Sequence, residues 1–490
     1  NPIRCCVDYA ALFKTLCLAC MPIQSAYIHR GSHVDKRLVG GLVAGSIVAT
    51  AIGAAIALHY WERHQARADL DAVGISYSEA NFIDEACAGN RAAVVLFLKT
   101  GMSPRTRGKD DITALHCAAR HGQDKLAQLL LTRGAETEAL SKDGRSPLHE
   151  AGSKGSAEVA RLLIDAGATI DVTNQQGDTP LLLASQRKND VTALLLERGA
   201  NPKIRNKNGD TPLLRIISQY GSSKEAAALV DLLLKKGADI NAANNDGRTP
   251  LMAAIGSGNR AIVEKLITGG ADVNAKGTHT TPLIAAASRA KLLRLLLENK
   301  ADPNLSADNG QTALDQATRA GNLEAVRLLL DAGARVEPAQ IGRDGPLHGA
   351  AANGSTEMIQ LLLMKGADAS GRGQGGRTPL HALTSGARTS TGDRVNGAKL
   401  LLEFGAKADA LDNQGQTPGQ IAQQSGNTEL VDLLTPRATS SNARPTATTA
   451  PGKPGSSPPP SAPANRHSSL PMPAPAPAPA PYPAAPNPRT

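Results

Sequence analysis

Four histidines, whose imidazoles are the side chains best suited to proton transfer near neutral pH, occupy the same place in a recurring phrase. His116, His149, His348 and His381 each stand three residues after a Thr, Ser or Gly. Other copies of the phrase put leucine, methionine, isoleucine or aspartate there. Leucine can neither accept nor donate a proton, so a catalytic histidine would not be exchanged for it. The pattern predicts structural histidines, hydrogen-bonded near a turn, and no catalytic residue.

The cysteines and carboxylates give no stronger indication of chemistry. Cys17 and Cys20 form one Cys-x-x-Cys pair, without the second pair or nearby histidine that would complete a zinc site. Cys87 and Cys117 stand in predicted helices beside apolar residues, and we interpret them as core thiols. No glycine-rich phosphate loop follows a strand, and no nucleophile has a partner at a meaningful spacing. The sequence therefore predicts no enzyme activity, no cofactor and no metal.

The phrase that holds the histidines is close to Thr-Pro-Leu-His, and it organises most of the chain. Its ten copies run from Thr113 to Pro418, at intervals of 31 to 39 residues that are most often 33. A period of this length is typical of a solenoid, in which each unit buries its apolar face only by stacking on its neighbours. The low aromatic content of 2% suits thin helix layers rich in Leu and Ala.

The stretch 146–177 shows what one unit should form. Ser146 can cap a helix, and Pro147 fits its first position, where no backbone donor is needed. Gly155 and Gly167 can each end a helix in the left-handed conformation that costs glycine nothing. An apolar stripe between the two glycines predicts a second helix, and the polar stretch that follows predicts a projecting loop or finger. The unit is thus helix, turn, helix and finger.

These features together closely resemble the ankyrin-repeat family. The resemblance rests on the Thr-Pro-Leu-His phrase, the glycine in mid-repeat, the Leu-Leu-Leu run and stretches such as Gly237 to Asn241, Gly-Ala-Asp-Ile-Asn. It covers residues 78–437 and implies an all-α solenoid of about eleven helix-turn-helix units, the first and last being caps. The family further implies a scaffold that binds another protein and has no chemistry of its own.

Three interior units depart from the pattern. The unit at 211 gains residues around Gly221 to Ala228, and the unit at 378 gains residues around Ser385 to Asn396. Both insertions should lie between the paired helices. The unit at 281 is shortened and has Lys300 where its neighbours have a glycine. We expect local irregularity at all three, either as tolerated loop variation or as a specialised contact.

The binding mode of the resembled family implies a set of contact residues. They would come from the finger tips and from the exposed ends of the first helices. Tyr220 is the strongest single candidate, because aromatic side chains tend to anchor interfaces. The implied protein-binding residues are Lys142, Asp143, Arg145, Ser153, Lys154, Gln175, Asp178, Gln186, Arg187, Lys207, Asp210, Tyr220, Asp246 and Arg248.

An uncharged apolar segment, residues 38–58, precedes the repeats. A helix of this length spans about 32 Å at 1.5 Å per residue, which matches a hydrocarbon core of about 30 Å. The sequence thus predicts a transmembrane helix and a single-pass membrane protein. Small residues recur every four positions, which would let two such helices approach closely and self-associate. They are Gly41, Gly45, Ala49 and Gly53.

Two other interpretations of this segment stay open. Ala55 and Ala57 fit a small-x-small cleavage site, so the segment could be a cleaved signal peptide of a secreted or periplasmic chain. It could also be a buried helix packed on the array. A slight excess of Lys and Arg before the segment would put the N-terminus in the cytoplasm and the repeats across the membrane. Residues 59–77 are expected to be a linker.

The two ends of the chain differ in composition from the array. Residues 1–37 form an N-terminal tail in which Met21 could be the true start. Residues 438–490 are rich in Pro, Ala and Ser, have no acidic residue, and are expected to be disordered. The formal charge of +9 includes no basic stripe interleaved with aromatics, so no nucleic-acid partner is expected. The Ala-, Gly- and Pro-rich composition suggests a bacterial source.

The leading hypothesis from the sequence is a membrane-tethered scaffold for protein–protein interaction, without catalysis. The alternative is an exported soluble binder or effector, with the 38–58 segment removed as a signal peptide. Neither hypothesis identifies the partner protein.

Overall fold

The computed structural model describes residues 36–435, apart from 188–189, 222, 339, 341 and 386–390. Within them the regular elements are helices, with one isolated bridge between Arg107 and Thr113 and no strand. Eleven helix pairs follow one another between Glu79 and Leu434. The predicted all-α solenoid of about eleven units is confirmed. The predictions for residues 1–35 and 438–490 lie outside the described residues.

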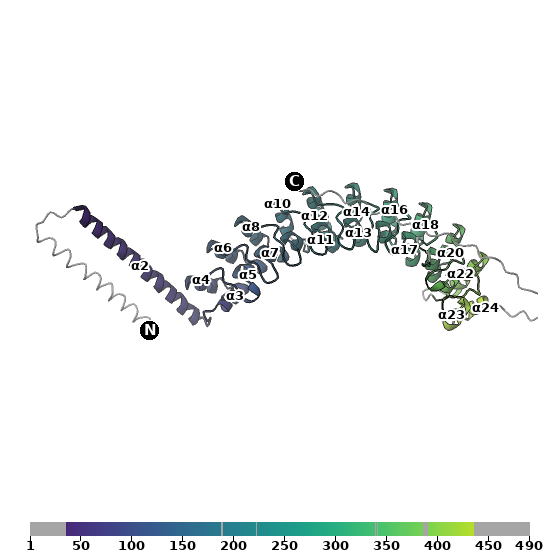
Figure 1. The fold of residues 1–490 in the computed structure, drawn as a ribbon, viewed down its shortest axis with the longest axis horizontal. Coiled ribbons are helices and arrows are strands. Elements are labelled where there is room, and N and C mark those ends of the chain that lie inside the picture. The colour runs from purple at the N-terminus through teal and green to yellow at the C-terminus, as the bar shows by residue number, and fades with distance from the viewer. Residues whose placement is uncertain are drawn as a thin grey trace, which may run out of the picture. The chain divides into compact units, whose positions relative to one another are not determined.

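The pairs repeat one plan, a first helix and a second helix joined by a short turn (Figure 1). In chain order they are α3 (Glu79–Ala88) with α4 (Arg91–Lys99), α5 (Ala114–His121) with α6 (Asp124–Thr132), α7 (Pro147–Lys154) with α8 (Ala157–Asp165), α9 (Pro180–Ala184) with α10 (Asp190–Glu197), α11 (Pro212–Tyr220) with α12 (Lys224–Lys235), α13 (Pro250–Ser257) with α14 (Arg260–Thr268), α15 (Pro282–Ala286) with α16 (Ala290–Glu298), α17 (Ala313–Ala320) with α18 (Leu323–Asp331), α19 (Pro346–Asn353) with α20 (Thr356–Met364), α21 (Pro379–Ser385) with α22 (Thr391–Glu403), and α23 (Pro418–Gln424) with α24 (Thr428–Leu434).

Helix α7 shows why the recurring phrase starts a helix. The Ser146 hydroxyl accepts a hydrogen bond from the backbone N–H of His149 at 3.4 Å, which satisfies a donor that the first helical turn leaves free. Pro147 follows at the first helical position, and Gly155 ends the helix with a φ of +86°. Each copy of the phrase thus sets the place where a first helix begins.

The core lies between two rows of stacked helices (Figure 1). First helices pack on first helices, as α5 does on α7 and α7 on α9, and second helices pack on second helices. Leu148 of α7, Leu163 of α8 and Leu181 of α9 are fully buried, so the apolar core continues from one repeat to the next. A single repeat would expose these faces, which is why stacking stabilises them.

The units at 211 and 378 differ from their neighbours in the length of the second helix, and the unit at 281 differs in the residue that ends it. The extra residues in the units at 211 and 378 lengthen the second helix, since α12 has 12 residues and α22 has 13 where most second helices have 9. Lys300 adopts a φ of +67°, close to the positive φ of Gly270 and Gly333 at the equivalent place. The backbone turn is therefore kept there, at the cost of strain in a non-glycine residue.

The apolar segment belongs to a longer helix, α2 (Lys36–Ala72). Within the described residues, no helix combines the length and the apolar character needed to cross a membrane. The prediction of a single-pass membrane protein is therefore wrong. Ten of the residues 38–58 are Gly or Ala, whose small side chains bury little apolar surface, and the helix then continues into charged residues such as Arg67 and Asp69.

The C-terminal part of α2 packs on the first repeat instead of linking to it freely. Ala66 and Leu70 are buried, and α2 contacts α4. The Arg63 guanidinium donates to the Thr100 carbonyl at 3.1 Å, and Arg67 lies over the ring of Tyr77. The stretch 59–77 expected to be a linker is thus helical as far as Ala72.

The spacing of small residues in α2 stays a prediction of self-association. The side chains at Gly41, Gly45 and Ala49 lie outside the described ones. Gly53 is exposed, and apart from its chain neighbours and the nearby backbone of its own helix no atom lies within 4 Å of the Cβ that an alanine would add.

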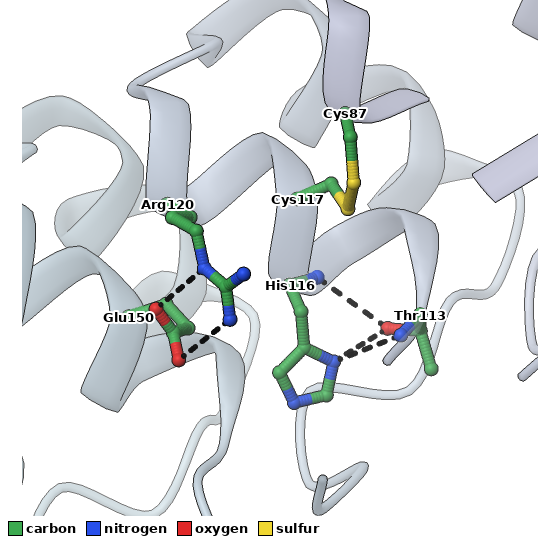
Figure 2. Close-up of a disulfide and its surroundings, with 6 residues drawn as sticks. All are labelled: Cys87, Thr113, His116, Cys117, Arg120 and Glu150. Carbon is green, nitrogen blue, oxygen red and sulfur yellow. Dashed lines mark hydrogen bonds and ion pairs between the residues drawn. A yellow bond between two sulfur atoms is a disulfide. The ribbon is translucent and has the colours of Figure 1, made fainter. Parts of the chain in front are cut away.

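Cys87 and Cys117 are joined by a disulfide, so their interpretation as core thiols is wrong (Figure 2). The bond connects α3 of the first helix pair to α5 of the second. Their Cα atoms are 4.6 Å apart, within the range that a disulfide requires. Stacking of successive first helices brings the two residues together, although 30 positions separate them in the sequence.

Candidate functional site

The fingers between successive repeats are joined by backbone hydrogen bonds. The N–H of Lys142 donates to the carbonyl of Asp110 at 2.8 Å, and the N–H of Gln175 donates to that of Asp143 at 3.1 Å. The same pairing continues from Lys207 to Gln176, from Asn245 to Asn208 and from Thr278 to Asp246, at 3.0 to 3.1 Å. Six fingers therefore form one ladder, and their tips are held in a fixed order along the array.

Three of these fingers are also closed by an asparagine side chain at the base. The Asn206 Oδ1 accepts from the backbone N–H groups of Asn208 and Asp210, both at 3.0 Å, and Asn174 and Asn244 make the same pattern in the neighbouring fingers. The Asn206 amide donates in turn to the Asp178 carboxylate at 2.8 Å. Side chains thus reinforce the backbone ladder.

The predicted contact residues divide by exposure. Eight are exposed, five are half-buried and one, Asp178, is buried. Asp178 therefore holds one finger against the next and is not presented to a partner. The exposed residues are Lys142, Asp143, Lys154, Gln175, Arg187, Lys207, Asp246 and Arg248, and the half-buried ones are Arg145, Ser153, Gln186, Asp210 and Tyr220.

Tyr220 and Gln186 come together at the ends of two neighbouring first helices. The Tyr220 hydroxyl donates a hydrogen bond to the carbonyl oxygen of Gln186. The Tyr220 ring packs against the core and is half-buried. The side chain thus keeps partial access to solvent, and its hydroxyl is held by the adjacent repeat.

Glu150 is a buried carboxylate that the sequence analysis missed. Its side chain is 1% exposed and accepts two hydrogen bonds from Arg120, at 3.0 and 3.2 Å (Figure 2). The Arg145 guanidinium lies 3.3 Å away. Burial alone would raise the pKa of Glu150, but the hydrogen bonds from Arg120 and the charge of Arg145 outweigh burial and hold it below its usual value. The only signal in the sequence is a charged residue on an otherwise apolar face of α7.

The phrase histidines connect each first helix to the next finger. In His149, Nδ1 accepts from the backbone N–H of Ser146 at 3.0 Å, and Nε2 lies 2.9 Å from the Asp178 carbonyl. Because Nδ1 accepts, Nε2 must carry the proton and donate to the carbonyl. His116, His348 and His381 make the same two contacts. Both ring nitrogens are thus hydrogen-bonded within the fold, where they link a helix start to the next finger.

Asp315 takes the histidine place in the unit at 312. Its Oδ2 accepts from the N–H and the hydroxyl of Thr312, both at 2.9 Å. Its Oδ1 is buried without a hydrogen-bond partner among the described residues. Burial raises the pKa of Asp315, because the charged carboxylate is poorly solvated there. The shorter side chain keeps the helix cap and gives up the link to the next finger.

The sequence was also compared with known proteins. A family model for ankyrin repeats in three copies matches residues 83–174, 115–206, 181–277, 275–340 and 346–447. The chain belongs to the ankyrin-repeat family. No curated protein matches the chain. The matched segments cover the helix pairs described above, so the ankyrin array accounts for most of the chain.

Protonation of His149 at acidic pH should lower the free energy of unfolding of this ankyrin array. Burial lowers the pKa of His149 to about 4, from the 6.5 of a solvated histidine. Between these values the unfolded chain binds a proton that the folded chain does not, so stability falls as the pH decreases from about 6.5 to about 4. The expected loss is up to about 3 kcal/mol. Urea unfolding at a series of pH values measures it.

The His149→Leu variant should flatten this part of the pH profile, because Leu182 and Leu214 fill the same place in other repeats. An equal dependence on pH between 6.5 and 4 in this variant would show that His149 is not its source.

Proposed function

We propose that the array is a scaffold that binds another protein along its fingers and the ends of its first helices. Membership of the ankyrin-repeat family supports this proposal, because such repeats suggest protein–protein interaction. The hydrogen bonds between successive fingers also support this proposal. Hydrogen bonds between successive fingers hold exposed side chains such as Lys142, Gln175 and Lys207 in one row before any partner arrives. A surface ordered in advance loses less conformational entropy on binding.

We further propose that the array acts by binding alone. The phrase histidines use both ring nitrogens within the fold, and the buried Glu150 is neutralised by Arg120 and Arg145. These groups are the strongest candidates for acid–base chemistry in the repeats, and each is already bonded to another group of the fold. The identity of the protein that binds is a question for capture experiments.

The proposal is tested by affinity capture with the full chain, followed by variants of the surface. Lys207→Glu reverses a charge on an exposed finger tip, and Lys125→Glu makes the same change on the second-helix row. A captured partner should bind the Lys207→Glu variant about tenfold more weakly and the Lys125→Glu variant with unchanged affinity. Equal affinities of both variants would place binding elsewhere and contradict the proposal.

The same capture experiment examines Tyr220. Tyr220→Phe keeps the ring and removes the hydroxyl that donates to Gln186, whereas Tyr220→Ala removes both. If the ring anchors the partner, only the alanine variant should lose about tenfold in affinity. Circular dichroism confirms that each variant keeps its helices. An alanine variant with normal affinity would remove Tyr220 from the contact surface.

A further inference from the structure

The ends of the first helices carry positive charge and no negative charge. We consider the seventh and eighth residues after each cap residue, from Thr113 to Thr417, and refer to these twenty places as the inner ends. Five of them are Arg or Lys, and none is Asp or Glu. The five cations are Arg120, Lys154, Arg187, Arg289 and Arg319.

The inner-end cations fall into two groups on neighbouring repeats. Arg120, Lys154 and Arg187 belong to three successive units, whose first helices α5, α7 and α9 pack in order. Arg289 and Arg319 belong to the successive units of α15 and α17, which also pack together. Uncharged residues occupy the inner ends between the two groups. Stacking therefore places these cations on neighbouring repeats in two groups. In the first group Arg120 is paired with the buried Glu150, so its unpaired charge comes from Lys154 and Arg187.

In the second-helix row, by contrast, several cations form ion pairs. Six of its cations are paired with acids on the same or the adjacent second helix, although others, such as Lys125 and Lys291, make no ion pair with a described residue. The pairs are Arg161 with Glu158, Arg198 with Asp165, Arg260 with Glu264, Lys265 with Asp231, Arg294 with Glu324, and Arg327 with Glu357. At the inner ends, Lys154 and Arg187 are exposed and make no ion pair with any described residue.

The finger tips carry both positive and negative side chains, whereas the charged residues at the inner ends are all positive. Lys142 stands beside Asp143, and Asp246 is close to Arg248, so the fingers offer both signs. Arg120, Lys154 and Arg319 lie in the last turn of their helices, where the helix dipole stabilises a cation by about 0.3–1 kcal/mol. A face with one sign of charge attracts partners of the opposite sign and repels those of the same sign.

We propose that the partner crosses the inner ends with an acidic segment, a stretch of protein rich in Asp and Glu. Its carboxylates would pair first with Lys154 and Arg187, and the fork of the Arg187 guanidinium matches a carboxylate in two hydrogen bonds. This inference rests on the proposed function and adds the chemistry of the partner. A protein segment fits better than a nucleic acid, because no Phe, Tyr or Trp side chain at the described inner ends or fingers is exposed for bases to stack on.

The test uses the full chain and defined probes. A fluorescein-labelled peptide of alternating Glu and Gly, about 16 residues long, is compared by fluorescence anisotropy with a Lys–Gly peptide of the same length. The acidic peptide should bind at least tenfold more tightly at low salt, and its affinity should fall as salt is added. Reversal of Lys154 and Arg187 together, K154E with R187E, should weaken it about tenfold.

The matched control is K125E with K291E, which makes the same change in net charge at two exposed positions of the second-helix row. This control should bind the acidic peptide like the unaltered chain. Equal weakening in both double variants would show that net charge alone governs binding and would overturn the proposal. Tighter binding of the Lys–Gly peptide, or of a single-stranded RNA of similar length, would overturn it as well.

The failure of this inference can be distinguished from the failure of the proposed function. A captured partner that loses affinity for K207E but binds K154E with R187E normally would leave the scaffold function intact and reject the acidic segment alone. A captured partner whose binding is weakened by both changes supports both proposals.

Discussion

Glu150→Ala is expected to lower the free energy of unfolding by about 3 kcal/mol, because it leaves two guanidinium groups without their shared carboxylate. The Glu150 side chain is 1% exposed, while those of Arg120 and Arg145 are 35% and 26% exposed. The Arg145 Nε is already buried without a hydrogen bond, so removal of the nearby negative charge leaves it uncompensated. Partial access of both arginines to water keeps the cost at the lower end of that for buried pairs.

Hydrogen exchange is the most direct measurement, since the repeats of a solenoid depend on their immediate neighbours. Protection should decrease in α5 and α7, which hold Arg120 and Glu150, more than in distant α17. Glu158→Ala is the control, because its pair with Arg161 is exposed and should contribute at most about 0.5 kcal/mol. A Glu150→Ala protein as stable as the Glu158→Ala protein would contradict the structural role of the buried carboxylate.

Reduction of the disulfide is expected to destabilise the first helix pair by about 3–4 kcal/mol, the chain-entropy estimate for a loop of about 30 residues. The Cys87–Cys117 bond joins α3 to α5, so its main effect should be on the end of the array. Without the bond, α3 and α4 should open before the interior repeats. Thermal unfolding with and without a thiol reductant, together with exchange protection of α3, measures the change.

Cys87→Ala with Cys117→Ala provides the control for reduction. This double variant should resemble the reduced chain, and a reductant should have no further effect on it. Mass spectrometry of an unreduced digest should find the two cysteine peptides joined. Recovery of both as free, alkylated thiols would contradict the disulfide, and an unchanged melting temperature on reduction would contradict its contribution to stability.

The repeat architecture could be predicted because its signals are local. A cap residue such as Ser146, a proline after it and a glycine such as Gly155 each act within a few residues, and the structure places a helix start or end at each. The period then implied stacking without any knowledge of distant contacts. The insertions after Gly221 and Ser385 could be located in the same way, although their effect on helix length could not.

What the sequence left open depends on contacts across repeats. The sequence analysis assigned no role to Glu150, because its burial and its pairing with Arg120 depend on the stacking of two repeats. Cys87 and Cys117 became a pair only when stacking brought α3 against α5. Asp178 was predicted to contact a partner, but its buried carboxylate accepts from the next finger. Exposure and pairing of polar groups are properties of the assembled stack.

The apolar segment misled the prediction for a different reason. Absence of charge over residues 38–58 suggested a membrane span, yet Gly and Ala make up nearly half of it. Absence of charge is a weaker criterion than apolar surface, since the free energy of transfer follows the area that leaves water. The part of α2 that packs on the array lies further along, at Ala66 and Leu70.

The finger ladder has a consequence for how such a chain can change in length. Within the ladder from Asp110 to Thr278, a finger amide pairs with a carbonyl of the finger directly before it, as Gln175 pairs with Asp143 and Lys207 with Gln176. Loss or duplication of one whole interior unit would therefore leave a matching donor and acceptor at the new junction, and the ladder could close again. A change of one whole unit should therefore keep the stacking while it alters the distance between inner-end charges on the two sides of the junction. Partner choice can thus diverge faster than architecture.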